Sequence, residues 1–299
     1  MAQVVHQRQA VVYEIAHAAG CVDLDLGIGA AVAALVGCDA TVAPRQRNHG
    51  LFPPGGAGEI AVIPLAVIAD DLTGAADAGI QFGCPKNQVL LVPPQKLAAI
   101  NPESIRGVLA VSTESRNLPP AAAGERVRQT GMALGRLRPQ MIYKKIDSCM
   151  RGNIGAEVAA LADAFGCRGA LIAPAFPAQG RITLHDVHYV HNIPVADSEM
   201  ARDPVSPVRA SRLSELIALQ YRQPVGRIDA VDLDGDPWRL KTLVEGLLKQ
   251  GRRLIVCDAA HQRHLEVVAR LANDQFPHLL LAGSAGLAQA LVRCQFEGT

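Results

Sequence analysis

The feature that most constrains this chain is a regular alternation of short apolar runs with longer helical patterns from about Leu65 onward. Each run is apolar almost throughout and ends in polar, Gly or Pro residues, which is typical of strands covered on both faces. The alternation predicts an α/β fold, a three-layer αβα arrangement around a mostly parallel sheet of roughly six or seven strands. The expected strands are residues 65–69, 89–92, 107–112, 141–144, 170–173, 254–257 and 279–282, and the expected helices are residues 74–83, 121–137, 154–165, 237–250 and 261–273. Residues 180–194 are expected to form a further strand or hairpin.

Composition limits the classes of partner. The chain has 299 residues, 49% of them hydrophobic, a net charge of +1 and only 19% charged residues, so we expect one or two domains and neither nucleic acid nor a membrane surface as partner. The longest apolar runs are far shorter than the roughly 20 residues that span a bilayer. A secretion signal is not evident, and the seven cysteines are odd in number and never spaced as CxxC. These features favour a cytoplasmic protein with reduced thiols.

Residues 1–61 do not join the alternating pattern. They are rich in Ala and Gly and include Pro53-Pro54-Gly55-Gly56, so we expect a leader that is either poorly ordered or packed separately. A more specific hypothesis is an incorrectly assigned start site. Gly58-Glu59 can be encoded by GGAGAG, a ribosome-binding sequence, and Val62 can be a GTG start codon.

Three polar loops follow expected strands, and ligands bind at the carboxyl ends of the strands in open α/β sheets. The first loop contains Asp70, Asp71 and Thr73. Two adjacent carboxylates in a cleft can hold a cation or accept a proton, and Thr73 adds a hydroxyl. The alternative is that Asp71 or Thr73 only caps the following helix.

The other two loops carry cations. In residues 112–116, Arg116 is flanked by hydroxyls and can grip a carboxylate, unless the loop is only a surface turn. Residues 144–153 offer Lys144, Asp147, Arg151 and Asn153 ahead of a helix, which together favour a bound anion. The alternative for this loop is a surface salt bridge between Asp147 and Arg151.

Residues 67–79, residues 143–148 with 151–153, and residues 173–181 resemble the four-carbon acid sugar kinase family. Residues 113–116, 201–204, 207–209 and 283–287 also match its pattern in the right order. The resemblance covers residues 62–292, which would form the N-terminal substrate-binding domain. Leu72, Ala76 and the Ile146-Asp147-Ser148 sequence look more like the D-threonate or D-erythronate branch than the 3-oxo-tetronate branch.

The resemblance implies phosphorylation of the 4-hydroxyl of a four-carbon sugar acid, with ATP and Mg²⁺ as cofactors. Asp70 and Asp71 would lie at the reacting hydroxyl, one as general base or magnesium contact. The substrate would be bound by Thr73, Arg116, Lys144, Asp147, Arg151, Asn153 and Arg181. Gly283, Ser284 and Gly286 would lie near the nucleotide, and the sequence does not identify metal ligands.

The sequence departs from the family in two ways. Cys149 and Met150 stand where the family usually has Thr and Leu, and residues 182–186 also differ. The family continues into a nucleotide-binding domain, whereas this chain stops at Thr299. We therefore expect residues 293–299 to be a truncated hinge, and the nucleotide-binding domain to be lost, truncated or supplied by a separate chain.

Two other function classes stay open. The first is a non-catalytic module that binds an acid sugar. The second is a phosphatase of the haloacid-dehalogenase type, which would use Asp232 or Asp70 as nucleophile, although Asp236 stands where that motif has Thr or Val.

Overall fold

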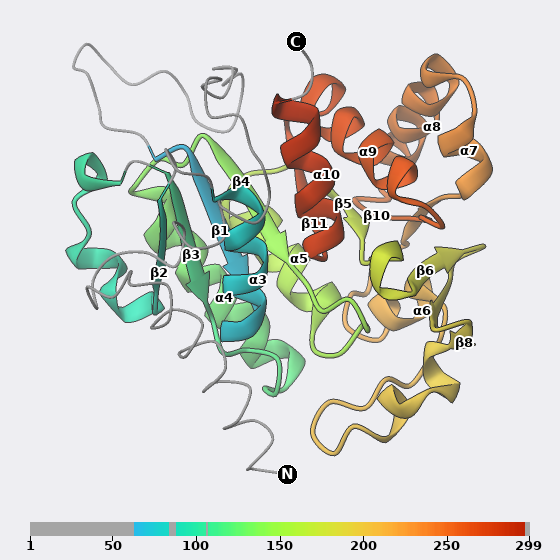
Figure 1. Ribbon diagram of the computed structural model, residues 1–299, viewed down its shortest axis with the longest axis horizontal. Coiled ribbons are helices and arrows are strands. Elements are labelled where there is room, and N and C mark those ends of the chain that lie inside the picture. Colours follow the sequence, from blue (N-terminus) through green and yellow to red (C-terminus); the bar gives the residue numbers. More distant parts are fainter. Residues whose placement is uncertain (1–62, 84–87, 106, 297–299) are drawn as a thin grey trace.

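The computed structural model describes residues 63–83, 88–105 and 107–296, and within them it contains an eight-stranded sheet of order β2-β3-β1-β4-β11-β5-β10-β9 (Figure 1). Every neighbouring pair in this sheet is parallel. The strands are β1 (Leu65–Ala69), β2 (Val89–Val92), β3 (Val108–Ser112), β4 (Met141–Lys145), β5 (Gly169–Ala173), β9 (Gly226–Ile228), β10 (Leu254–Cys257) and β11 (Leu279–Gly283). The prediction of a three-layer fold around a mostly parallel sheet is confirmed.

Helices cover both faces of the sheet. One face packs against α3 (Leu72–Phe82), α8 (Pro237–Lys249), α9 (Gln262–Arg270) and α10 (Ala285–Phe296). The other face packs against α4 (Pro120–Gly135), α5 (Ile154–Ala164) and α6 (Leu213–Ala218). Because each face has its own apolar cluster, central strands such as β1, β3 and β5 are buried along their whole length, as their uninterrupted apolar runs predicted.

Shorter helical elements connect these layers. They are α7 (Ala230–Asp234), η1 (Pro94–Ala99), η2 (Pro102–Ser104), η3 (Pro177–Gln179), η4 (Val195–Asp197), η5 (Glu199–Arg202) and η6 (Leu271–Gln275). The expected helix over residues 261–273 ends instead at Arg270 and continues as η6, a single π-helical turn.

A small antiparallel sheet extends from the carboxyl edge of the main sheet after β5 (Figure 1). It consists of β6 (Arg181–Leu184), β7 (Val187–Val190) and β8 (Ile193–Pro194). His185 and Asp186 in the first turn, and His191 and Asn192 in the second, all have positive φ angles. Tight two-residue turns with left-handed backbone are typical of hairpins, so the hairpin expected in residues 180–194 is confirmed.

β9, α6, α7 and α10 were not predicted from the sequence. β9 is an edge strand of three residues in which Arg227 is exposed, so it has no apolar run. α6 and α7 are too short to show a helical repeat. The predicted leader, residues 1–61, lies outside the described residues. Of the predicted hinge, Arg293–Phe296 belong to α10, and residues 297–299 lie outside the described residues.

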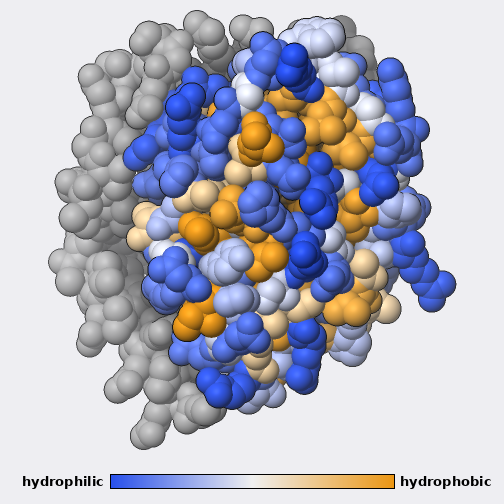
Figure 2. All heavy atoms as spheres, turned by 90° about the vertical axis from the view of Figure 1, so that its right-hand side faces the viewer, coloured by the Kyte–Doolittle hydropathy of each residue, from blue (hydrophilic) through white to orange (hydrophobic). Residues whose placement is uncertain are grey.

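The face formed by α7, α8 and the small sheet mixes apolar and hydrophilic side chains (Figure 2). Val231 and Trp238 are its most exposed large apolar residues, at 74% and 72%. Among the described residues, no helix is long and apolar enough to cross a membrane.

Close contact between strands requires glycine at position 169. A Cβ added to Gly169 would lie 2.2 Å from the backbone oxygen of Arg253, which belongs to the connection into β10. We expect Gly169→Ala to lower the free energy of unfolding by about 1–3 kcal/mol, because the neighbour is backbone and cannot move aside cheaply. Gly246→Ala is the control, since nothing lies within 4 Å of that Cβ. In a helix interior it should raise stability by up to about 1 kcal/mol. Equal effects in urea titrations would contradict this account.

Candidate active site

The carboxyl ends of three neighbouring strands bring the predicted loops together. β1 lies between β3 and β4, and its last residue, Ala69, is in register with both Ser112 and Lys145. The loops that follow these strands therefore meet at one edge of the sheet. They contain all the aspartates and arginines of the predicted site except Arg181.

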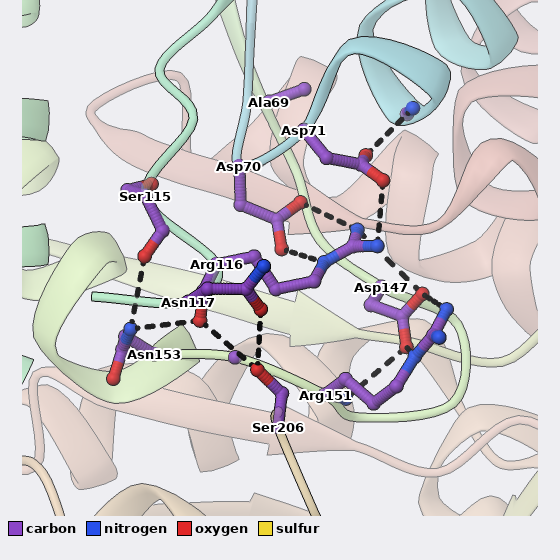
Figure 3. Close-up of polar contacts among 12 residues, drawn as sticks. Ala69, Asp70, Asp71, Ser115, Arg116, Asn117, Asp147, Arg151, Asn153 and Ser206 are labelled. Atoms are coloured by element: carbon purple, nitrogen blue, oxygen red, sulfur yellow. Dashed lines mark hydrogen bonds and ion pairs between the residues drawn. The ribbon is translucent and has the colours of Figure 1, made fainter. Parts of the chain in front are cut away.

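Arg116 is the centre of this cluster (Figure 3). Its Nε and Nη2 donate to the two carboxylate oxygens of Asp70 at 2.7 and 3.0 Å. Its Nη1 lies 2.6 Å from Oδ2 of Asp71, and its Nη2 lies 3.7 Å from Oδ1 of Asp147. One guanidinium thus pairs with three carboxylates from two different loops, a geometry that its planar set of donors permits.

The electrostatics of the cluster follow from burial and this pairing. Burial would lower the pKa of Arg116, but the attraction of Asp70 raises it above its ordinary value. Burial and the neighbouring Asp70 raise the pKa of Asp71, against the opposing effect of Arg116. Asp71 also has the more accessible side chain of the pair, 25% exposed compared with 4% for Asp70. Asp71 is therefore the carboxylate better placed to accept a proton from a ligand.

Asp71 has a second contact, because its Oδ1 accepts a hydrogen bond from the Gly74 N–H at 2.7 Å. It is thus the N-cap of α3, and the capping role considered in the sequence is confirmed alongside its pairing with Arg116. Thr73 lies in the exposed first turn of the same helix.

Arg151 and Asp147 form a second pair in the loop after β4. Nε and Nη2 of Arg151 donate to the two oxygens of Asp147, both at 3.0 Å. Burial would raise the pKa of Asp147, but the hydrogen bonds from Arg151 and the charge of Arg116 hold it well below its ordinary value. Nη1 of Arg151 also reaches Asp203 at 3.3 Å, and the Arg151 side chain remains 29% exposed. Arg151 is the arginine of the cluster that is most accessible to a ligand.

Asn153 fixes the position of the Arg116 loop. Its Nδ2 donates to the carbonyl oxygens of Ser115, Arg116 and Leu118, at 2.8–3.2 Å. Ser206, from the loop after η5, donates to the Arg116 carbonyl at 3.3 Å (Figure 3). The amide of Asn153 therefore holds backbone, and its predicted role as a substrate ligand remains a prediction.

The two adjacent lysines at the end of β4 point to opposite faces of the sheet, as alternate residues of a strand do. Lys144 is fully buried, and its Nζ lies 2.8 Å from Glu157 on α5. Lys145 points toward α3, where its Nζ lies 4.0 Å from Asp77. The predicted ligand is Lys144 and not Lys145. The alternation of a strand was the feature in the sequence that could have indicated Lys145.

The buried pair of Lys144 and Glu157 continues into a hydrogen-bonded chain. Glu157 accepts a hydrogen bond from Ser115 at 2.8 Å, and the hydroxyls of Ser115 and Thr113 are 2.7 Å apart. Burial raises the pKa of Glu157. These hydrogen bonds link α5 to the loop that carries Arg116 and so stabilise the position of that loop.

Arg181 enters the same region from β6. Its Nη1 donates to Ser148 Oγ at 3.0 Å, and it also bonds Gln179. Its Nε is buried without a hydrogen-bond partner among the described residues. Arg181 therefore keeps one donor that the fold does not satisfy.

The predicted nucleotide-proximal residues lie where β11 turns into α10. A Cβ on Gly283 would lie 2.6 Å from the Ala173 oxygen, and one on Gly286 would lie 3.0 Å from the Ala175 oxygen. Ser284 Oγ donates to that same Ala175 oxygen at 2.6 Å. These residues let α10 pack closely on the loop after β5, and their proximity to a nucleotide remains a prediction.

Among the described residues, no group of three or more His, Cys, Asp or Glu side chains forms a site that could hold a metal ion. Asp232 accepts a hydrogen bond from the Asp229 backbone at 2.9 Å and completes the capping box of α7. This contact gives the Asp232 motif a structural role in the helix, and it offers no support for a phosphatase nucleophile.

A cavity of about 220 Å³ adjoins the cluster. Its polar lining includes Arg116, Asn117, Asn153, Arg209 and Gln220. Val205 and Leu219, exposed by 61% and 69%, belong to its lining as well. The cavity is large enough for a small polar ligand, and Arg116 connects it to the aspartates.

Residues 65–291 match the family described as sugar-binding N-terminal domain. The chain belongs to this family. D-threonate kinase from Salmonella typhimurium is 38% identical over 230 residues, covering 76% of this chain and 53% of the relative. D-erythronate kinase from Heliobacterium modesticaldum is 35% identical over 211 residues, covering 69% and 47%. The resemblance to four-carbon acid sugar kinases is thereby confirmed, and the chain spans about half the length of these curated relatives.

A solved structure from Bordetella bronchiseptica has the same fold. It is described as a domain of unknown function with bound citrate, in a domain-swapped dimer. It aligns with a TM-score of 0.68 and 30% identity, covering 78% of this chain and 57% of that one.

His188 on β7 holds the loop after β4 in place. It is fully buried; its Nε2 lies 2.8 Å from the Ser148 carbonyl and its Nδ1 lies 3.0 Å from Thr183 Oγ1. A carbonyl only accepts, so Nε2 carries the proton and Nδ1 accepts from the Thr183 hydroxyl. Burial lowers the pKa of His188 from 6.5 to about 4.

This pKa predicts how stability depends on pH. Between pH 6.5 and 4 the unfolded chain binds a proton at His188 that the folded protein does not bind. The contribution of neutral His188 to the free energy of unfolding is therefore full above pH 6.5 and is lost as the pH falls through 4. At about 1.36 kcal/mol per pKa unit, the loss amounts to about 3 kcal/mol. Urea titrations of His188→Asn should show a flatter pH dependence. Val190→Ala, on the same strand, should lower stability while keeping the wild-type slope, and an unchanged slope in His188→Asn would refute the assignment.

Proposed function

We propose that this chain is the substrate-binding part of a kinase that uses ATP to phosphorylate the 4-hydroxyl of a four-carbon sugar acid such as D-threonate or D-erythronate. The observation that carries the proposal is the cluster of Asp70, Asp71, Arg116, Asp147 and Arg151 at the carboxyl edge of the sheet. Phosphoryl transfer depends mainly on positioning and on charge neutralisation, and this cluster supplies both carboxylates and cations. The names of the relatives support the same class of substrate.

The acid group of the substrate is assigned to Arg151. Its guanidinium already pairs with Asp203, whose side chain is 22% exposed, so an incoming carboxylate can replace that contact at the surface. Arg116 is held by three aspartates and acts as an organiser of the site. The Bordetella bronchiseptica structure is described with bound citrate, which is itself a carboxylate.

Asp71 is assigned as the base. Its raised pKa and partial exposure suit a group that accepts the proton of the substrate hydroxyl. Asp70 is held on both oxygens by Arg116, so it fixes the guanidinium. Gly283, Ser284 and Gly286 would face the nucleotide, whose binding requires the part of the kinase that this chain does not span.

The described residues fit Mg²⁺ only as an ion that arrives with the nucleotide. Mg²⁺ is commonly held by one or two carboxylates together with substrate phosphates, and Asp71 and Asp77, with side chains 25% and 45% exposed, are the accessible carboxylates around α3. When bound, the ion would neutralise phosphate charge. A kinase that uses cellular ATP would act in the cytoplasm.

The first test concerns substrate binding. Calorimetric titration of the chain with D-threonate should show binding, and Arg151→Ala should weaken it by roughly tenfold or more because a charge-assisted contact is lost. Arg128→Ala is the matched control, since Arg128 forms an exposed pair with Glu125 on α4 and should leave the affinity unchanged. Unaltered affinity in Arg151→Ala would remove this residue from the site.

The second test concerns catalysis. The chain is mixed with ATP, D-threonate and the separately expressed remaining half of the Salmonella typhimurium kinase. Asp71→Asn should lower kcat by roughly 10²–10⁴-fold while largely sparing D-threonate affinity, because a base acts on the proton and contributes little to binding. Asp163→Asn, in an exposed pair with Arg253, is the control.

The outcomes separate the function classes. Turnover with the added half supports the kinase. Binding without turnover under every condition favours a non-catalytic acid-sugar-binding module. Full activity in both Asp70→Asn and Asp71→Asn would exclude the aspartates from the mechanism.

A further inference from the structure

Charge pairing at the carboxyl edge leaves two cations incompletely neutralised. Arg116 has three carboxylate partners, and Lys144 is sealed against Glu157 at 2.8 Å. In contrast, the nearest carboxylate to Lys145 Nζ within the described residues is Asp77, at 4.0 Å. No described carboxylate lies within 4.0 Å of the Arg181 guanidinium, whose buried Nε also lacks a hydrogen-bond partner.

Lys145 is nearly as buried as these paired cations, with its residue only 5% exposed. A buried ammonium is costly unless an anion or several acceptors surround it. The fold therefore holds a positive charge in a position where its own carboxylates only partly compensate it. Such a position is favourable for an anionic ligand.

Lys145 also lies beside the proposed base. A Cβ on Gly74 would lie 2.6 Å from Asp71 Oδ1 and 3.1 Å from Lys145 Nζ. The Asp71 carboxylate and the Lys145 ammonium thus both border the space beside Gly74, in the first turn of α3. A hydroxyl whose proton goes to Asp71 would have its oxygen close to Lys145.

Arg181 reaches the loop that follows Lys145, because its Nη1 donates to Ser148 Oγ at 3.0 Å. Burial raises the pKa of Asp77, and the charges of Lys145 and Arg181 both oppose that rise. The Asp77 side chain is 45% exposed, so solvent reaches the carboxylate that pairs with Lys145. Gly283 of β11 is in register with Lys145, and α10 begins two residues later with its N-terminus at the same edge.

We infer that Lys145 and Arg181 form the subsite that receives the transferred phosphoryl group, with Asp77 as the counterion of Lys145 before an anion binds. The inference rests on the proposed kinase function and adds a location and a catalytic residue, Lys145, to it. Arg181 is thereby assigned to the phosphoryl group and not to the sugar acid.

The step balances with ATP as phosphoryl donor. The 4-hydroxyl oxygen of the acid forms a new bond to the γ-phosphorus as the bond from that phosphorus to the β,γ-bridging oxygen breaks. The electron pair of the broken bond leaves with ADP, and the hydroxyl proton passes to Asp71. Lys145 and Arg181 neutralise the charge on the non-bridging oxygens during transfer.

The test compares a ligand with and without the phosphoryl group. The complete chain is titrated calorimetrically with D-threonate and with 4-phospho-D-threonate. In Lys145→Met the affinity for the phosphorylated acid should fall by roughly tenfold or more, because a charge-assisted contact to phosphate is lost. D-threonate affinity should fall much less, because only its neutral 4-hydroxyl lies near Lys145. Lys145→Arg should restore most of the loss.

Two further variants keep the test sharp. Lys241→Met replaces an exposed lysine of α8 and should change neither affinity. Arg181→Met alters a different element and should also weaken only the phosphorylated acid, so the inference can be judged even if Lys145→Met does not fold. Equal weakening of both acids in Lys145→Met, or no weakening of the phosphorylated one, would overturn the inference.

Inorganic pyrophosphate separates this inference from the proposed function. If the wild-type chain bound pyrophosphate in a Lys145-dependent manner but bound neither sugar acid, the phosphoryl subsite would stand and the substrate assignment would fall. If D-threonate bound and pyrophosphate affinity did not depend on Lys145, the substrate assignment would stand and the subsite would fall.

Discussion

The pairing of Arg116 with Asp70, Asp71 and Asp147 is the interaction on which the rest of the site depends. Three carboxylates from the ends of β1 and β4 converge at one edge of the sheet, where their mutual repulsion would separate the loops. A single guanidinium reaches all three, since its donors lie in one plane and point in different directions. Lysine could not replace it, because a compact ammonium cannot bond both oxygens of Asp70 and still reach Asp71.

The structure secures this guanidinium through its backbone as well as its side chain. Asn153 holds three carbonyls of the Arg116 loop, and Glu157 holds Ser115 within the same loop. Both residues come from the start of α5, so the helix and the loop form one unit. Gly152, with φ +93°, is required where this unit approaches Arg116, because a Cβ there would lie 3.2 Å from that side chain and from Asp70. Contacts within the protein therefore fix the Arg116 loop relative to α5.

The sequence predicts which loops form the site, but it does not predict most of the ion pairs within and between them. Uninterrupted apolar runs predicted the strands, and parallel strands carry their carboxyl-end loops to one edge, so Asp70, Arg116 and Asp147 could be grouped without a structure. Some cations pair with carboxylates that lie far away in the chain, as Lys144 does with Glu157, and the sequence does not show which cations do so. The face of the sheet that each lysine occupies was accessible from strand alternation, but the existence of a buried acid opposite Lys144 was not.

The separation of Lys144 from Lys145 suggests how one strand end can serve two purposes. On the α5 face, the charge of Lys144 is paired with Glu157, which also holds Ser115 in the loop that carries Arg116. On the α3 face, the charge of Lys145 lies beside Asp71 and is only partly compensated by Asp77, at 4.0 Å. A pair of adjacent residues thus divides between support and chemistry because the sheet separates them.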